Sequence, residues 1–311
     1  MINIEEIRTK AAAWLGEEFD EATRSEVKHM MEHDEKALID AFYQDLEFGT
    51  GGLRGIMGAG TNRMNRYTLG MATQGLSNYL KKHASNPSSI KVAIAHDSRN
   101  NSSYFAKVAA DIFVANGFTA LLFDALRPTP VLSYAIRMHG CDAGVIITAS
   151  HNPKEYNGYK VSWNDGGQVV SPHDKGIIDE VRSIKSVSEI ATGGDPSRIV
   201  TIGEETDKKY MEEVLKLSIN PEIIKRNSGM GIVYTPLHGT GYKMVPDALK
   251  LYGFKNVYPV PEQSITDGNF PTLRSPNPEE PDALAMALDL ARAKNADLVM
   301  APDPDADRLG I

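Results

Sequence analysis

Three aspartates, Asp303, Asp305 and Asp307, alternate along the stretch PDPDADR, directly after an apolar run. In a curled loop, carboxylates at this spacing can converge on one hard divalent cation, which would relieve their mutual repulsion. The first alternative is a solvated acidic turn, although carboxylates packed this closely are costly without a counter-ion. A calcium EF-hand does not fit, because Arg308 stands where that loop needs glycine. An aspartyl-phosphate enzyme is a further alternative, since an acid after a buried strand can be phosphorylated.

A second apolar run ends abruptly at Ser150 in the stretch IITASHNP. Serine is a weak nucleophile that needs a base, a lowered pKa or a metal on its oxygen, and the adjacent His151 need not point toward it. The sequence has no G-x-S-x-G motif, which disfavours an ordinary serine hydrolase. Two readings of Ser150 therefore stay open: a catalytic hydroxyl, or a loop-start hydroxyl that bonds to the backbone. Lys160, ten residues further on, has the matching alternative of a solvated strand lysine.

Strand and helix patterns alternate after residue 67, which favours two α/β domains, each with three α/β/α layers and a mostly parallel mixed sheet. The first set of expected strands is 91–96, 119–123, 143–148 and 158–163, the last an antiparallel candidate, with helices at 67–83, 102–116 and 129–139. A Ser-, Gly- and Pro-rich stretch over 184–205 indicates a linker. The order then restarts with strands 231–235, 256–260 and 297–301 and helices 242–252 and 281–293. The two domains are therefore expected to be copies of one unit.

The segments before the first domain have a different character. Residues 1–46 have a helical, amphipathic period and predict an N-terminal helical extension. A glycine-rich stretch with three arginines, among them Arg54, follows and is either an anion site or a plain flexible connection. We expect the extension to be followed by α/β domains over 47–190 and 206–311, the second of them truncated at its last strand.

The serine loop and the aspartate loop each follow the third strand of a predicted copy. Ligands of open α/β sheets collect outside the carboxyl ends of the strands, so the two loops occupy equivalent positions. One serine oxygen and three carboxylates make a cage suited to magnesium. A serine in such a cage is suited to carry a phosphoryl group, with Arg54 or Arg308 clamping the phosphate oxygens.

Composition limits the partners. The net charge of −8 and the absence of a basic run argue against a nucleic-acid partner. No run of 18 apolar residues is present, so we expect no membrane span, and the acidic N-terminus does not read as a signal peptide. The single cysteine, Cys141, excludes an intramolecular disulfide and a Cys-rich metal site. These features favour a cytoplasmic protein.

The motifs are similar to those of a known family, the α-D-phosphohexomutases, which include phosphoglucomutases and phosphomannomutases. TASHNPKEYNGYK (148–160) resembles the phosphoserine loop of that family, and DPDADR (303–308) resembles its metal loop. The order of the two motifs and their separation by about 150 residues make the match specific. FGTGGLRG (48–55), preceded by the helical extension, looks most like the branch whose phosphoglucomutases also act on phosphopentoses.

The resemblance implies specific roles for site residues. It implies a magnesium site formed by Ser150, Asp303, Asp305 and Asp307. It implies catalytic groups at the transferring phosphate: Arg54, Ser150, His151 and Lys160. It implies contacts to the substrate from Arg54, Ser150, Asp307 and Arg308.

The implied reaction interconverts a hexose 1-phosphate and the corresponding hexose 6-phosphate, and glucose is the hexose that the resemblance favours. A phosphoserine would give its group to the sugar, and the resulting sugar 1,6-bisphosphate would return the other phosphate. Phosphomannomutase and phosphopentomutase are alternatives of the same chemistry. A non-catalytic module that binds magnesium and phosphate, and a phosphatase with Asp303 as its nucleophile, are alternatives of other classes.

The sequence departs from the family pattern in its extent. Family members carry a third domain with a G-E-x-S-G loop and a fourth with an R-x-S-G-T loop, and neither pattern occurs in these 311 residues. We therefore expect an N-terminal fragment whose partners include the missing C-terminal domains. By itself, such a fragment should have little or no mutase activity.

Overall fold

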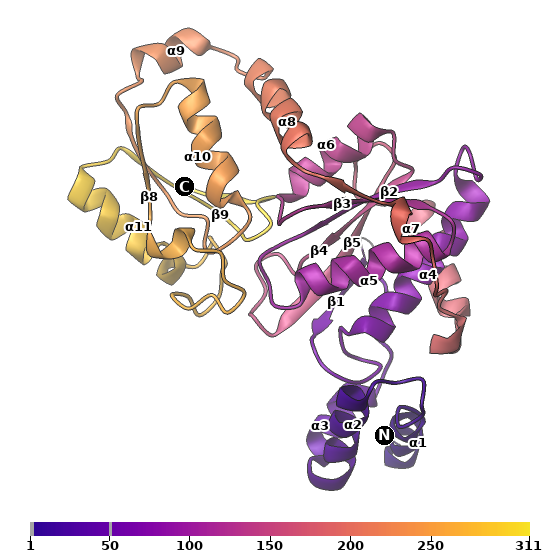
Figure 1. Cartoon of the computed structure of the whole chain (residues 1–311). Helices are drawn as coiled ribbons and strands as arrows, with labels where there is room; N and C mark the ends of the chain where they lie inside the picture. Colours follow the sequence, from indigo (N-terminus) through magenta and orange to yellow (C-terminus); the bar gives the residue numbers. More distant parts are fainter. Residues whose placement is uncertain (1–2, 50–51) are drawn as a thin grey trace.

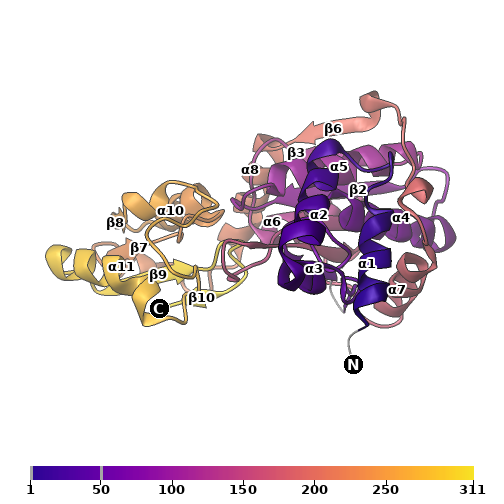
Figure 2. The same cartoon turned by 90° about the horizontal axis from the view of Figure 1, so that it is seen from below.

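The computed structural model describes residues 3–49 and 52–311 (Figure 1). Thr50 and Gly51, part of the predicted glycine-rich connection, lie outside the described residues. Two α/β units lie side by side, and a group of three helices projects from one end of the first unit (Figures 1 and 2). Within the described ranges, no helix combines the length and the apolar character needed to cross a bilayer.

The N-terminal extension consists of α1 (Ile4–Ala13), α2 (Glu21–His33) and α3 (Glu35–Phe42). The N-cap residue of each helix is Asn or Asp and accepts a backbone N–H, which satisfies a donor that the helix leaves unpaired. Trp14 stacks on Phe19 with the ring centres 4.6 Å apart. The hydroxyl of Tyr67, on the next helix, donates to Asp20 at 2.9 Å. The extension is therefore joined to the first α/β unit by an aromatic core and a hydrogen bond.

The first unit is built on a six-stranded sheet with the order β1-β5-β4-β2-β3-β6. In that order the strands are Gly52–Ile56, Tyr156–Trp163, Ala143–Ile147, Lys91–His96, Thr119–Phe123 and Ile199–Ile202. Strands β4, β2, β3 and β6 are parallel, and β5 is antiparallel to both of its neighbours. The antiparallel direction expected for 158–163 is confirmed.

Helices cover both faces of this sheet because its strands alternate their side chains between two apolar cores. Val92 and Ile94 face a core shared with α4 (Arg66–His83), α5 (Ser102–Ala115) and α7 (His173–Ser183). Ala93 and Ala95 face the opposite core, which includes α6 (Thr129–His139). The three-layer α/β/α arrangement predicted from the alternating pattern is confirmed.

The linker predicted over 184–205 was wrong in its second half. It begins with the short 3-10 turns η1 (Val187–Glu189) and η2 (Pro196–Arg198), but β6 then pairs in parallel with β3 at the sheet edge. After it, α8 (Glu204–Lys216) packs against α6 and continues through α9 (Pro221–Arg226). The β-branched residues of β6, IVTI, favour a strand, but the Ser, Gly and Pro around them led to the prediction of a linker.

The second unit repeats the strand arrangement of the first. Its sheet has the order β10-β9-β7-β8. In that order the strands are Leu309–Gly310, Leu298–Pro302, Gly231–Tyr234 and Asn256–Pro259. One antiparallel and two parallel pairings follow each other as in β5-β4-β2-β3. Helices α10 (Gly241–Tyr252) and α11 (Pro281–Lys294) lie on opposite faces, and η3 (Glu262–Ser264) follows β8 (Figures 1 and 2). The prediction of two copies of one unit is confirmed.

Candidate active site

The serine loop and the aspartate loop meet between the two units. Ser150 follows β4 and Asp303 follows β9, the topologically equivalent strands. The Ser150 hydroxyl donates to Asp303 Oδ2 at 2.5 Å across 153 residues of sequence. Ser150 is 2% exposed and has a left-handed backbone with φ of 53°. This close approach confirms the expected juxtaposition of the two loops.

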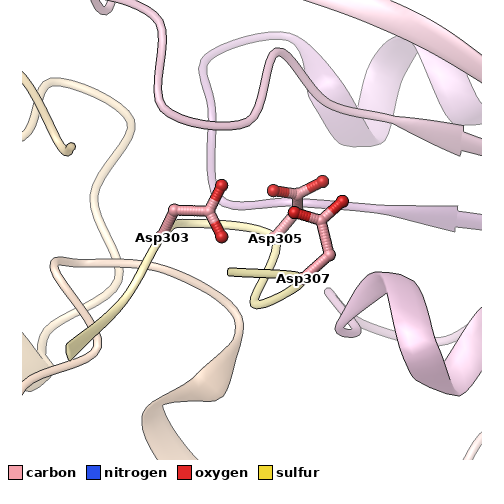
Figure 3. Close-up of side chains that lie close together, drawn as sticks. All are labelled: Asp303, Asp305 and Asp307. Atoms are coloured by element: carbon pink, nitrogen blue, oxygen red, sulfur yellow. The ribbon is translucent and has the colours of Figure 1, made fainter. Parts of the chain in front are cut away.

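The three aspartates form one carboxylate cluster. Their side chains point toward one another from a single loop (Figure 3), and one oxygen from each lies within 4.8 Å of the others. Asp303 and Asp305 are buried, whereas Asp307 is exposed. Ala306 has a φ of 56°, which turns the chain between the last two aspartates. A tight loop therefore brings the alternating carboxylates onto one side.

The loop of residues 235–241 packs against the aspartate loop and forms hydrogen bonds with it. Thr240 donates to the Pro304 carbonyl from its backbone N–H at 2.7 Å and from its hydroxyl at 2.9 Å. A Cβ on Gly239 would lie 2.4 Å from Pro304 Cα, so no larger residue fits there without movement. The aspartate loop is thus fixed by close backbone packing.

The first unit supplies positive charge to this cluster. Lys160 on β5 donates to Asp305 at 2.7 Å and to Asp307 at 3.0 Å. Thr129, the first residue of α6, donates from its hydroxyl to the Asp305 carboxylate at 2.9 Å and from its backbone N–H to the Asp305 carbonyl oxygen at 2.8 Å. The positive end of the α6 dipole therefore adds to the lysine charge.

These neighbours separate the pKa values of the two buried aspartates. Burial, together with the charge of Asp305, raises the pKa of Asp303 to about 7. Burial also acts to raise the pKa of Asp305, but the charge and hydrogen bond of Lys160 outweigh it and lower that pKa. Burial opposes the Lys160 ammonium, yet Asp305 and Asp307 raise its pKa overall. Lys160 and Asp305 thus remain charged at neutral pH, while Asp303 is the carboxyl that takes up a proton.

The cluster fits a hard divalent cation. Asp305 Oδ1 is buried and finds no hydrogen-bond partner among the described residues. An unpaired buried carboxylate oxygen is costly unless something positive meets it. The donors around it are all oxygens, from three carboxylates and a serine hydroxyl, and such donors suit magnesium. Ser150, Asp303, Asp305 and Asp307 are the residues that could hold it.

The remaining predicted residues surround the serine loop. His151 Nδ1 lies 3.3 Å from the Ser150 hydroxyl oxygen, and burial with the charges of Arg308 and Arg54 lowers the pKa of His151. Arg54, exposed on β1, donates to Asn152 Oδ1 at 3.0 Å. The Arg308 side chain is exposed and lies 3.4 Å from Glu279, while its backbone N–H donates to Asp303 at 3.1 Å. Two charged arginines therefore flank the serine with their side chains toward solvent.

The glycine-rich stretch contributes only one of its three arginines to this site. Arg63 forms an ion pair with Asp40 at 2.6 Å, and Arg66 lies over the Tyr67 ring at 5.6 Å. The ion pair joins the stretch to α3 of the N-terminal extension, whereas Arg66 and Tyr67 are neighbours on α4. Arg54 alone among the three bonds to the serine loop.

Sequence reasoning missed two residues that touch the site. Arg99 lies beneath the serine loop and donates hydrogen bonds to its carbonyls. The Thr129 hydroxyl donates a hydrogen bond to the Asp305 carboxylate. A signal for Arg99 was present, since it stands three residues after the strand 91–96, at the same carboxyl edge as Ser150. Thr129 opens a correctly predicted helix, but nothing in its local sequence indicates a partner 176 residues away.

The Asp303 carboxyl would make the binding of magnesium to this cluster pH-dependent. A ligand must be deprotonated to bind metal, so protons compete with magnesium below the pKa of about 7. We expect the affinity to rise about tenfold per pH unit from about pH 5 to 7 and then to level off, measured by isothermal titration calorimetry. Without metal, rising pH has the opposite effect on stability. The Asp303 carboxyl ionises at a lower pH in the unfolded chain than in the folded one, so the free energy of unfolding falls as the pH rises from about 4 to 7. Asp303→Asn should remove both the pH dependence of the magnesium affinity and that of the free energy of unfolding. An unchanged pH dependence in that variant would contradict the assignment of the raised pKa to Asp303.

Comparison with known proteins agrees with this geometry. Residues 45–188 match the family model described as phosphoglucomutase/phosphomannomutase, alpha/beta/alpha domain I, and residues 208–311 match domain II. A probable phosphoribomutase from Schizosaccharomyces pombe is 36% identical over 307 residues, covering 96% of this chain and 52% of the relative. A phosphoglucomutase from Staphylococcus haemolyticus is 37% identical over 303 residues, covering 90% and 53%.

A solved structure shares the fold. The phosphoglucomutase/phosphomannomutase family protein from Burkholderia thailandensis superimposes with a TM-score of 0.66 at 20% identity. The match covers 84% of this chain and 53% of that one. The chain thus spans about half the length of the relatives it matches.

Two equivalent α/β/α units present a serine after β4 and an aspartate cluster after β9, and the two matching family models describe α/β/α domains over these same parts of the chain. The chain belongs to the phosphoglucomutase/phosphomannomutase family and contains its domains I and II. The resemblance noted in the sequence is confirmed at the level of the family.

Proposed function

We propose that this chain is the phosphoryl-carrying part of a phosphosugar mutase that interconverts sugar 1-phosphates and 6-phosphates, with glucose as the preferred sugar. The observation that supports this best is the 2.5 Å contact of Ser150 with Asp303, inside a cluster of three carboxylates. A buried serine in such surroundings can carry a phosphoryl group if a cation balances the charge. Magnesium bound there would spread the negative charge of the transferring phosphoryl group.

The residues of the chain have distinct roles in the proposed transfer. The phosphoryl group leaves the Ser150 oxygen as its phosphorus forms a bond to a sugar hydroxyl oxygen. The hydroxyl proton must end on the serine oxygen. His151 is suited to accept and return it, because its lowered pKa keeps the ring neutral and Nδ1 lies 3.3 Å from that oxygen. Lys160 keeps its charge and holds Asp305 and Asp307, while Arg54 and Arg308 bind phosphate oxygens.

The turnover needs a second transfer in the opposite sense. The sugar, now a 1,6-bisphosphate, reorients and returns its other phosphate to Ser150. The net change is the position of one phosphate on the sugar, and the serine ends phosphorylated as it began.

Relatives of this chain are named for different sugars. One relative is named for ribose and another for glucose at nearly equal identity, so a phosphopentomutase or a phosphomannomutase activity is the alternative. We propose that the choice of sugar lies in C-terminal domains that complete the site. We also propose boundaries of 1–46 for the extension, 47–190 for the serine-loop domain and 206–311 for the aspartate-loop domain, with β6 as an outlying strand of the first sheet.

Phosphate uptake tests the proposal directly. The 311-residue chain is incubated with glucose 1,6-bisphosphate and magnesium and is then mapped by tandem mass spectrometry. We expect one phosphoryl group, on Ser150. A phosphoryl group on Asp303 would indicate a phosphatase, and no uptake at all would indicate a binding module. Turnover of glucose 1-phosphate by this chain alone is expected to be slight, and efficient turnover would contradict the need for further domains.

A further inference from the structure

A buried arginine lies directly under the serine loop. The Arg99 side chain is fully buried. Its guanidinium donates to four backbone carbonyls of one loop, those of Ser150, Asn152, Pro153 and Tyr156, at 2.5 to 3.1 Å. One side chain thus bonds to four carbonyls spread between Ser150 and the start of β5.

The Pro153 carbonyl also accepts the Tyr156 backbone N–H, whereas the carbonyls of Ser150 and Asn152 are bonded by Arg99. The loop leaves β4 with Ser150 at a positive φ, a conformation that non-glycine residues seldom adopt. A buried backbone carbonyl needs a donor, and the planar fork of arginine can serve several acceptors at fixed angles. A lysine has a single ammonium and cannot reproduce that pattern. The serine backbone is therefore held in its unusual conformation by Arg99.

Arg99 is itself held from below. Its Nε faces Asp97 Oδ2 at 3.3 Å, and Asp97 Oδ1 accepts hydrogen bonds from the Arg99 backbone N–H and the Ser102 hydroxyl. Asp97 is 1% exposed, so this pair is buried on all sides. The carboxylate fixes the orientation of the guanidinium, and the guanidinium fixes the loop.

The second unit caps the same guanidinium. The Phe270 ring lies 5.1 Å from the Arg99 guanidinium carbon, in a cation–π arrangement. The neighbouring Asn269 accepts a hydrogen bond from the Asn100 side chain at 3.0 Å. A Cβ on Gly268 would lie 2.3 Å from the Asn100 backbone nitrogen, so the two loops touch closely. The loop of residues 267–270 therefore docks onto Arg99 from the other unit.

We infer that Arg99 is a positioning residue that holds Ser150 in its transfer geometry and couples that geometry to the docking of the 267–270 loop. The inference rests on the proposed function for its kinetic consequence. The structural part of the inference, that Arg99 fixes the backbone of residues 150–156, does not depend on the proposed function. Arg99 does not face the reacting atoms and acts only through the backbone of the serine loop.

The test compares Arg99→Lys with Arg292→Lys, a control on the surface. Lysine keeps the charge beside Asp97 but loses the fork. Hydrogen exchange reports on the loop, since the amides of Asn152 and Tyr156 bond within it. We expect their exchange to be at least about tenfold faster in Arg99→Lys and unchanged in Arg292→Lys. The rate of phosphate uptake at saturating glucose 1,6-bisphosphate should fall about 100-fold, with little change in the half-saturating concentration.

Phe270→Leu provides the second arm because it leaves Arg99 and Asp97 intact. Faster exchange at Asn152 and Tyr156 in this variant would support the coupling between the units, and unchanged exchange would overturn it. Unchanged loop exchange in folded Arg99→Lys would overturn the hold on the loop. If the unmodified chain takes up no phosphate, the proposed function fails, while the exchange measurements still decide the role of Arg99.

Discussion

Replacement of Ser150 by alanine is expected to reduce phosphate uptake from glucose 1,6-bisphosphate by at least about 10⁴-fold, to background. The oxygen that bonds to phosphorus is removed, and the Thr129 hydroxyl, which also lies at the cluster, donates to Asp305 and not to Asp303. Intact-mass measurement after incubation with donor and magnesium gives the uptake. The fold should survive, because the hydrogen bonds of the Ser150 side chain to other described residues go to Asp303 and His151 alone.

Two companion variants separate this expectation from its alternatives. Ser275→Ala removes a nearby hydroxyl that donates to the His151 carbonyl, and this control should still become phosphorylated. Asp303→Asn should slow uptake but leave the product on Ser150. Retained uptake in Ser150→Ala, with loss in Asp303→Asn, would instead identify Asp303 as the phosphorylated residue.

Local patterns predicted the elements that position the site. The helix expected over 129–139 has the bounds of α6, and the strand expected over 91–96 has those of β2. Gly253 caps α10 with a φ of 111°, directly after the end of the helix expected over 242–252. These features depend on side-chain periodicity and on one residue's backbone freedom, which are readable in a short window.

The strands of the first sheet that were missed are its two edge strands. Strand β1 lies in the glycine-rich stretch for which an anion site or a flexible connection was expected, and β6 lies in the predicted linker. Each has five residues or fewer and gains its hydrogen bonds from a strand far along the chain. Pairing of this kind depends on the sheet already present and is invisible to local composition.

The residues of the candidate site likewise fall into those that local sequence predicted and those that it did not. Ser150 and the three aspartates were found because each loop follows an equivalent strand in a repeated unit. The place of Arg99 after the strand 91–96 was readable, but its partners are backbone carbonyls, which residue identity does not reveal. Thr129 was missed because it contacts Asp305 only through the packing of the two units. Backbone-directed contacts and contacts between units are thus the part that the sequence left unpredicted.

The charges of the site are divided between the two units. The second unit contributes the carboxylates, and the first contributes Lys160 and the N-terminus of α6. Neither set is balanced without the other, since two of the carboxylates are buried. The association of the units therefore depends in part on this charge pairing, and Lys160 is the residue at which the dependence can be measured.

Lys160→Met is expected to lower the free energy of unfolding of the metal-free chain by about 3–5 kcal/mol, because it leaves a buried carboxylate unpaired. Lys160 holds the pKa of Asp305 below its ordinary value, and a lowered pKa contributes stability above the unfolded value near 4. The raised pKa of Lys160 contributes stability below about 10, its unfolded value. The deficit of the variant should therefore be largest between about pH 5 and 9 and should shrink as Asp305 is protonated. Urea unfolding across this range measures it.

Magnesium provides the decisive comparison for this variant. A cation bound to the cluster would replace the missing positive charge, and a ligand at about 100 times its dissociation constant adds about 2.7 kcal/mol to stability. We expect magnesium to stabilise Lys160→Met more than the unmodified chain, because the ammonium no longer shares Asp305 and Asp307 with the metal. Lys154→Met, which removes an exposed lysine from the serine loop, should behave like the unmodified chain in both conditions. Equal stability of Lys160→Met and Lys154→Met without metal would show that the lysine does not hold the two units' charges together.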